Sequence, residues 1–339
     1  MRSAEVRKTR IEVRRASPRL AIQLLLCGGL WAPVALEAQA LTEGRWPLQP
    51  GSRVERVIAP FLEGWYLNDD QTVTYSFGYL NLNDSTVEIP IGEGNLIEPA
   101  RFGGMQPTVF LPGRRRGMFA VTVPASMRDD DVWWRITNPN GTVTEVPGTS
   151  SWAAYRLDWV PRPHGTVPPE VSFDGGEDPI GPGRGPAGVL AARTMTTSAG
   201  VPTALSVDVK EISVRLPDET DPTLLRGPAT LRVVWTPYQG PVGAKVDFSR
   251  HPTTPEQPED PDGARWGARC YSAVPCASLD EDQIILVPSG EGTVRVVATF
   301  SEPGDYVIHA QVDNWGLPDS TFQNQCCWTN GYVRVAVSP

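Results

Sequence analysis

The stretch FLEGWYLNDDQTVTYSFGYLNLNDSTVEI, residues 61–89, decides the fold class, because it is the longest window without proline in the chain beyond residue 40. Within it, polar and apolar side chains alternate one by one over Thr72, Val73, Thr74, Tyr75, Ser76 and Phe77. This period of two predicts a half-buried β-strand. The segment LNDDQ, residues 67–71, is rich in Asn and Asp and predicts a turn. The window therefore predicts a β-hairpin whose first arm is residues 61–67.

The 34 prolines of the chain disfavour helices everywhere else. A proline inside a helix costs about 3 kcal/mol, and few other windows are free of proline for long enough to hold one. Short β-rich runs recur instead, at residues 108–112, 117–124, 131–137, 142–147, 204–214, 229–238, 244–249, 292–300, 304–314 and 331–337. Short strands at this spacing predict an all-β chain built from sandwiches or barrels.

The first 40 residues predict a signal peptide. Seven basic residues and two acidic ones precede the apolar run LAIQLLLCGGLWAPVAL, residues 20–36, and AQA at residues 38–40 predicts cleavage after Ala40. The run is too short, and too interrupted by glycine and proline, for a membrane span. We therefore expect an exported bacterial protein, secreted or periplasmic, with no membrane span in its mature part.

The remaining chain predicts two domains. The first β-sandwich domain covers residues 41–160. The segment PRPHGTVPPE, residues 161–170, contains four prolines and predicts a semi-rigid, extended linker. The second domain covers residues 171–339 and contains a long polar insertion at residues 250–282.

Four segments of the second domain carry a resemblance to a known kind of module, namely PPEVSF (168–173), LRVVWTPYQGP (231–241), VDFS (246–249) and ATFSEPGDYVIHAQVDN (298–314). They look like a PKD-type, immunoglobulin-like extracellular module. With this resemblance, the expected fold is all-β, with two tandem immunoglobulin-like β-sandwich domains after a cleaved signal peptide. The PGxY step would place Tyr306 at a corner of the sandwich. Tyr306, Ile308, Ala310 and Val312 would then point inward, while Val307, His309 and Gln311 would point outward.

The whole chain also resembles a set of uncharacterised exported bacterial proteins. The segments EGWYLNDDQTVTYSFGYLNLN and CCWTNGYVRV carry this resemblance. It implies no particular activity.

Loss of the signal peptide would leave four cysteines, Cys270, Cys276, Cys326 and Cys327. An even number in an exported protein favours disulfide bonds. Either the first two and the last two pair locally, or one of two other pairings joins the insertion to the approach of the last strand, or the thiols stay unpaired. A vicinal bond needs a distorted peptide, because adjacent Cα atoms are about 3.8 Å apart and disulfides prefer about 4.4–6.8 Å. Yet neighbours on an extended strand face opposite sides, which disfavours the other two pairings. The spacing fits neither a zinc site nor a redox C-x-x-C pair, so we predict a structural role.

Catalytic patterns are missing from the sequence. The three histidines, at positions 164, 251 and 309, share no metal-binding spacing, and there is no H-E-x-x-H, G-x-S-x-G or P-loop motif. We predict no catalytic residue, no cofactor, no metal site and no enzymatic activity. The acidic runs at residues 128–133 and 258–263 keep two alternatives open: calcium bound by carboxylates, although neither run fits the D-x-[DN]-x-[DN]-G pattern, or the carboxylate pair of a glycoside hydrolase.

The net charge and the aromatic residues of the loops indicate which kinds of partner to expect. The net charge is −9, and without residues 1–40 the chain has 23 basic and 36 acidic residues, or −13. An acidic protein has no general attraction for phosphate backbones, so we expect no nucleic acid. The basic segment GRRRG, residues 113–117, predicts a solvated hairpin tip. Four aromatic residues in or beside loops are candidate ligand-binding residues: Trp266, Tyr271, Trp315 and Trp328. They could stack on sugars or on a partner; alternatively, they cover the edge of a core or the interface between the domains.

Together these features predict a non-catalytic binding or scaffolding protein of the bacterial cell envelope or exterior. Its ligand would be a polysaccharide or another envelope protein. The alternatives are a secreted carbohydrate-active hydrolase that uses a carboxylate pair, and a structural subunit of a surface assembly joined through an exposed edge strand.

Overall fold

The first hairpin forms as the sequence predicts. In the computed structural model, strand β1 (Ile58–Leu67) pairs antiparallel with β2 (Val73–Asn81). The Asn68 N–H donates to the Thr72 carbonyl at 2.9 Å, and the Thr72 N–H donates to the Asp70 carboxylate at 3.0 Å. The side-chain acceptor of Asp70 thus closes the turn, as expected for an Asx residue.

The structure describes residues 56–157, 165–173, 181–213, 230–254, 279–314 and 327–339. The predicted signal peptide, residues 1–40, lies outside this part of the chain. Residues 56–339 belong to one compact unit. Within the described ranges, helical structure is limited to the single-turn 3₁₀ helices η3 (Ala100–Phe102), η4 (Ala125–Met127), η5 (Ala153–Tyr155) and η7 (Glu281–Gln283). None of the described helices has the length and apolar character that crossing a bilayer requires.

Strand β2 is more deeply buried than its alternation predicted. Strand β6 (Gly113–Val123) pairs with its second edge, so β2 is the central strand of the sheet β1-β2-β6. Phe77 lies in the core, and Thr74 and Ser76 on the opposite face are also buried. The Thr74 hydroxyl is 2.8 Å from the Thr122 hydroxyl, which satisfies it. The prediction of a half-buried strand was wrong, because alternation reports the polarity of a face and not whether the rest of the chain covers that face.

The other strands of the first half form a second sheet and a short ribbon. The sheet has the order β4-β7-β8 and the ribbon pairs β3 with β5. Their bounds are β3 (Val87–Glu88), β4 (Asn95–Glu98), β5 (Val109–Phe110), β7 (Val132–Thr137) and β8 (Val143–Gly148). The core of this half is aromatic. The ring of Phe119 lies 5.2 Å from that of Phe77 and 4.9 Å from that of Trp134, between ring centroids.

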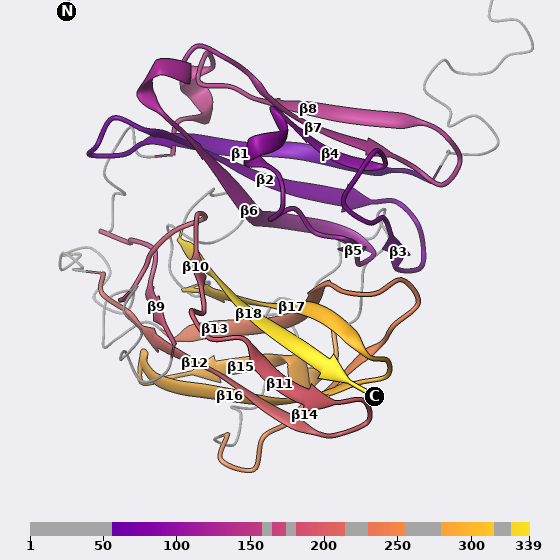
Figure 1. Ribbon diagram of the computed structural model, residues 1–339. Helices are drawn as coiled ribbons and strands as arrows, with labels where there is room; N and C mark the ends of the chain where they lie inside the picture. The colour runs from indigo at the N-terminus through magenta and orange to yellow at the C-terminus, as the bar shows by residue number, and fades with distance from the viewer. Residues whose placement is uncertain (1–55, 158–164, 174–180, 214–229, 255–278, 315–326) are drawn as a thin grey trace, which may run out of the picture. The chain divides into compact units, whose positions relative to one another are not determined.

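The second half contains two larger sheets (Figure 1). One has the order β14-β16-β12-β9, and the other has the order β10-β18-β17-β13-β15, with β11 parallel to β18. Their bounds are β9 (Glu170–Ser172), β10 (Val189–Leu190), β11 (Met195–Ser198), β12 (Thr203–Lys210), β13 (Leu231–Gln239), β14 (Val246–Arg250), β15 (Ile284–Val287), β16 (Glu291–Phe300), β17 (Gly304–Asp313) and β18 (Trp328–Ser338). One hydrophobic core is formed from both sheets. The protein is therefore all-β.

The alternation predicted for β17 is confirmed. Tyr306, Ile308, Ala310 and Val312 belong to the core of the second half. The Tyr306 hydroxyl donates to the Glu302 carbonyl at 2.6 Å. A tyrosine that bonds back to the backbone a few residues upstream closes the corner between two strands, as the PGxY step predicted.

Candidate functional site

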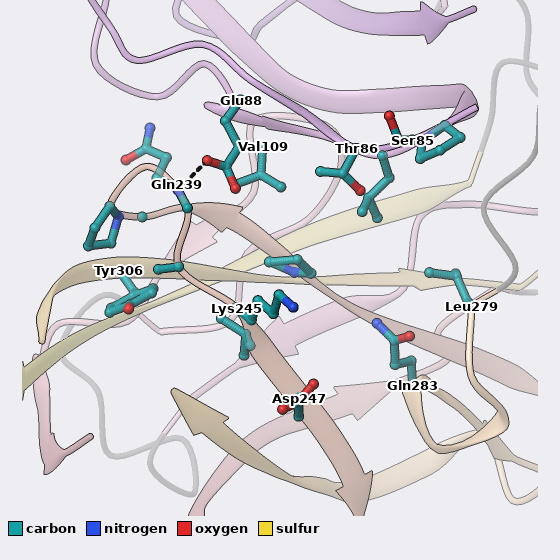
Figure 2. Close-up of a pocket in the computed structure, with 18 of the residues that line it drawn as sticks. Ser85, Thr86, Glu88, Val109, Gln239, Lys245, Asp247, Leu279, Gln283 and Tyr306 are labelled. Atoms are coloured by element: carbon teal, nitrogen blue, oxygen red, sulfur yellow. Dashed lines mark hydrogen bonds between the residues drawn. The ribbon is translucent and has the colours of Figure 1, made fainter. Parts of the chain in front are cut away.

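The described residues enclose a groove of about 680 Å³. Residues within 84–88 and 109–112 form one wall, and residues within 237–247, together with Leu279, Gln283 and Tyr306, form the other. Figure 2 shows Thr86, Glu88 and Val109 on the first wall, and Lys245, Asp247 and Gln283 on the second. We call this cavity the groove.

The two walls are held together by hydrogen bonds. The Thr108 N–H donates to the Tyr238 carbonyl at 2.9 Å. The Gln239 side-chain amide donates to the carbonyls of Gly104 and Gln106 at 2.9 and 2.8 Å. These bonds join segments that are more than a hundred residues apart in sequence, so the groove is a built feature of the fold.

A bulge in β13 makes this joint. The pairing of β13 with β17 shifts register between Pro237 and Gln239. Proline has no N–H for the ladder, and a bulge re-aims the side chain that follows. Tyr238 accordingly belongs to the aromatic core of the first half, although its strand belongs to the second half. Its hydroxyl also donates to the Met105 carbonyl.

Charged side chains line the groove. The Glu88 carboxylate accepts a hydrogen bond from the Gly243 N–H at 2.5 Å, which helps close one end. Asp84 is ion-paired with Arg56.

Lys245 and Asp247 are exposed, and within the described part of the chain neither side chain has a hydrogen-bond or ion-pair partner. Opposite charges two residues apart on one strand project to the same side. They are suited to a polar or charged ligand.

Most of the titratable groups whose pKa is shifted from its ordinary value lie in a buried network next to the sheet β1-β2-β6. Arg114 is 2.6 Å from Glu63, whose side chain is only 1% exposed. Burial raises the pKa of Glu63, and the Arg114 guanidinium opposes this shift. The prediction that residues 113–117 form a solvated hairpin tip was wrong. The segment is the start of β6, in which Arg116 is exposed while Arg114 is partly buried and paired with Glu63 on β1.

His309 lies in the same network. It points away from the core of its own sandwich, as alternation predicted, but it is buried, with 1% of its surface exposed. Its ring stacks on Tyr332 with centroids 5.2 Å apart, and its Nε2 is 2.9 Å from Asn330 Oδ1. Burial lowers the pKa of His309 to about 4, so the imidazole is neutral at neutral pH.

Asn330 connects three segments through its side chain. Its amide donates to the carbonyls of Gly117 and Pro186 at 2.7 and 2.8 Å, while its carbonyl faces His309. The neighbouring Tyr332 hydroxyl donates to the Met118 carbonyl at 2.7 Å. β18 is therefore bonded directly to β6.

Of the four aromatic residues predicted to bind a ligand, the structure describes one. Trp266, Tyr271 and Trp315 lie outside the described residues. Trp328 is described and is only 7% exposed, because its indole packs directly against Gly117. A Cβ atom added to Gly117 would lie 2.2 Å from the indole ring. Trp328 is thus not an exposed stacking platform; its position matches the alternative interpretation of these aromatics as covering residues.

Of the four cysteines predicted to form disulfide bonds, one lies among the described residues. Cys327 is buried and has a φ of +98°. Cys270, Cys276 and Cys326 lie outside the described residues, so the pairing of the four cysteines stays a prediction. Among the described residues, no group of three or more His, Cys, Asp or Glu side chains is arranged to hold a metal ion.

Sequence reasoning missed the groove. The strand AKVDFS was predicted, and its alternation could have placed Lys245 and Asp247 on one face. The opposite wall could not have been predicted, because residues 84–112 come close only through tertiary contacts.

Comparisons with known proteins add little. Neither a protein-family model nor a curated protein matches the sequence. Among solved structures, the chain is similar to a chimeric titin Z1Z2 functionalized with a KLER exogenous peptide from decorin, with 14% identity over 85% of this chain and 100% of that one, and a TM-score of 0.16. No argument about function rests on a likeness this weak.

Proposed function

We propose that the protein is a non-catalytic exported protein of the bacterial cell envelope or exterior that binds its ligand in the groove. The observation that carries this proposal is a groove whose walls are tied together and which is lined by two exposed charged side chains. The walls are joined by backbone and side-chain amide hydrogen bonds, whereas the Lys245 ammonium and the Asp247 carboxylate bond to no other group among the described residues and can meet a ligand. Pre-organised pockets with a few placed polar groups are typical of binding sites.

The frame itself is proposed to be two tandem immunoglobulin-like sandwiches. An immunoglobulin-like sandwich pairs a four-stranded sheet with a three-stranded one. In the second half, the sheet β14-β16-β12-β9 corresponds to the first, and the strands β18-β17-β13 correspond to the second. The parallel pairing of β11 with β18 and the Tyr306 corner support the same assignment. This fold hosts many functions, so the site and not the fold supports binding.

A non-catalytic role is supported by where two of the titratable groups with shifted pKa values lie. Perturbed groups often mark active sites when they line a cleft. Here Glu63 and His309 are engaged by Arg114 and Asn330 in a buried network away from the groove. The side chains of Glu63 and His309 therefore contribute to the packing of the fold.

The proposal is tested by binding of the purified protein to a glycan array and to extracts of envelope proteins. Thr86→Trp places an indole in the groove, and Thr137→Trp adds the same side chain at an exposed site on β7 outside the groove. We expect binding that the Thr86 variant loses and the Thr137 variant keeps. Failure of the wild-type protein to bind either class of ligand would reject the proposal.

A hydrolase is the second candidate, because Asp84, Glu88 and Asp247 all line the groove. Two carboxylates about 5–10 Å apart are sufficient for glycoside hydrolysis. The test is release of reducing ends from any polysaccharide that the array identifies. Turnover abolished by Glu88→Gln or Asp247→Asn would favour the hydrolase over the binding protein.

A further inference from the structure

Among the described residues, strand β14 has one edge that pairs with no strand. It is the outermost strand of its sheet and pairs antiparallel with β16 without a break in register. In that register Lys245 lies opposite Ser301, and the Ser301 N–H donates to the Lys245 carbonyl at 3.0 Å. Hydrogen-bonded and non-hydrogen-bonded pairs alternate along antiparallel strands. The N–H and C=O groups of Val246, Phe248 and Arg250 therefore point away from β16, and within the described residues no strand pairs with them.

The open edge begins in the groove. Lys245, Val246 and Asp247 line it. The 3₁₀ helix η7 packs against β14, but its Gln283 side chain donates its amide to the Trp235 carbonyl at 3.0 Å and accepts from the Asp280 N–H at 3.0 Å. Both ends of that side chain are therefore occupied elsewhere.

The walls favour a peptide over a sugar. Among the described residues that line the groove, the aromatic one is Tyr306, and with 3% exposure it offers no ring face for a sugar to stack on. An edge strand instead presents donors and acceptors every second residue, about 7 Å apart, which is the repeat of another β-strand. Val109 and Leu111 on the opposite wall can receive apolar side chains.

We propose that the groove binds an extended polypeptide segment of a partner protein, which adds to β14 as a further strand. This deepens the proposed function and rests on it. Backbone hydrogen bonds to Val246 and Phe248 provide the affinity, and the side-chain pockets provide the selectivity, as in other cases of strand addition. The carboxylates of Glu88 and Asp247 against the single ammonium of Lys245 favour a segment that carries a basic residue.

The test begins with selection of short random linear peptides displayed on phage against the purified protein. Enriched peptides are then synthesised in two forms, unmodified and N-methylated at alternate residues. N-methylation removes backbone donors and keeps every side chain. Loss of several backbone hydrogen bonds should weaken binding by at least about tenfold in the N-methylated form.

A protein variant tests the same edge. Val246→Pro removes one outward N–H and leaves the ladder to β16 intact, since proline is tolerated at such edge positions. Val143→Pro is the matched control. The Asn138 N–H donates to the Thr142 carbonyl at 2.8 Å, so the same alternation turns the Val143 N–H outward on β8, remote from the groove. We expect weaker peptide binding for the Val246 variant only. If that variant fails to fold, the N-methylated peptides still decide.

The outcomes separate the inference from the proposed function. Peptide binding that N-methylation does not affect would overturn strand addition. Glycan binding that Thr86→Trp abolishes, with no enriched peptide, would overturn the inference and leave the proposed function standing. Absence of peptide, glycan and envelope-protein binding would overturn both.

Discussion

At the scale of single residues, burial of charge and of polar groups distinguishes this protein from a plain β-sandwich. Glu63 is almost fully buried and is compensated by Arg114. His309 is buried as a neutral ring between Tyr332 and Asn330. None of these pairs could be recognised in the sequence, because the partners lie between 21 and 51 residues apart and meet only after the strands have paired.

The first prediction concerns the Glu63–Arg114 pair. Arg114→Met leaves the buried carboxylate without its counter-charge, and removing one partner of a buried pair costs about 3–5 kcal/mol. We expect a loss of unfolding free energy of about 3 kcal/mol in chemical denaturation at neutral pH. Arg56→Met is the control, because the Arg56–Asp84 pair is exposed and should contribute less than about 1 kcal/mol. Equal effects of the two substitutions would contradict this account.

The second prediction concerns pH. The pKa of His309 is about 4 in the folded protein and 6.5 in the reference state. The unfolded chain therefore binds the proton more tightly, so stability is present above pH 6.5 and is lost as pH falls toward 4. The loss amounts to about 3 kcal/mol. Denaturation midpoints measured across this range should show a slope in the wild type that His309→Gln lacks, and parallel profiles would disprove the assignment.

At the scale of elements, the contact of β6 with β18 depends on a glycine. Gly117 has a φ of +56°, and a Cβ there would lie 2.2 Å from the indole of Trp328. The positive φ is easy for glycine and strained for other residues, and the missing side chain makes room for the ring. The sequence showed both residues, but not that the segment GRRRG would end against a tryptophan more than two hundred residues later.

The third prediction tests that contact. Gly117→Ala should destabilise the protein by about 3 kcal/mol, through the strained φ and the overpacking of Trp328. Gly200→Ala is the control, because Gly200 has a similar positive φ, +75°, but has open space around it. Thermal unfolding should show a larger fall in Tm for the Gly117 variant. A similar fall for both would mean that backbone strain alone is responsible.

At the scale of the whole molecule, the two cores are linked. Residues 56–339 form one unit, and Tyr238 and Tyr332 from the second half belong to the core of the first. The tandem arrangement proposed above is thus accompanied by direct bonds between β18 and β6.

The fourth prediction follows from this linkage. Scanning calorimetry should show one cooperative transition, with equal calorimetric and van't Hoff enthalpies. Asn330→Leu removes the bonds to Gly117, Pro186 and His309, and should split the transition or broaden it. Two well-resolved transitions in the wild type would show that the halves unfold independently.

The sequence by itself determined the strands: proline spacing and alternation set most of their positions, and the PGxY step set the Tyr306 corner, because these are local properties of the backbone and of neighbouring side chains. Short strands such as β4 and β15 escaped prediction, since four residues carry too little periodicity. Tertiary structure alone decided that β2 is covered on both faces, that Glu63 meets Arg114, and that residues 84–112 face Lys245 and Asp247 across the groove. These outcomes depend on which surfaces of distant strands are complementary, and that complementarity exists only in three dimensions.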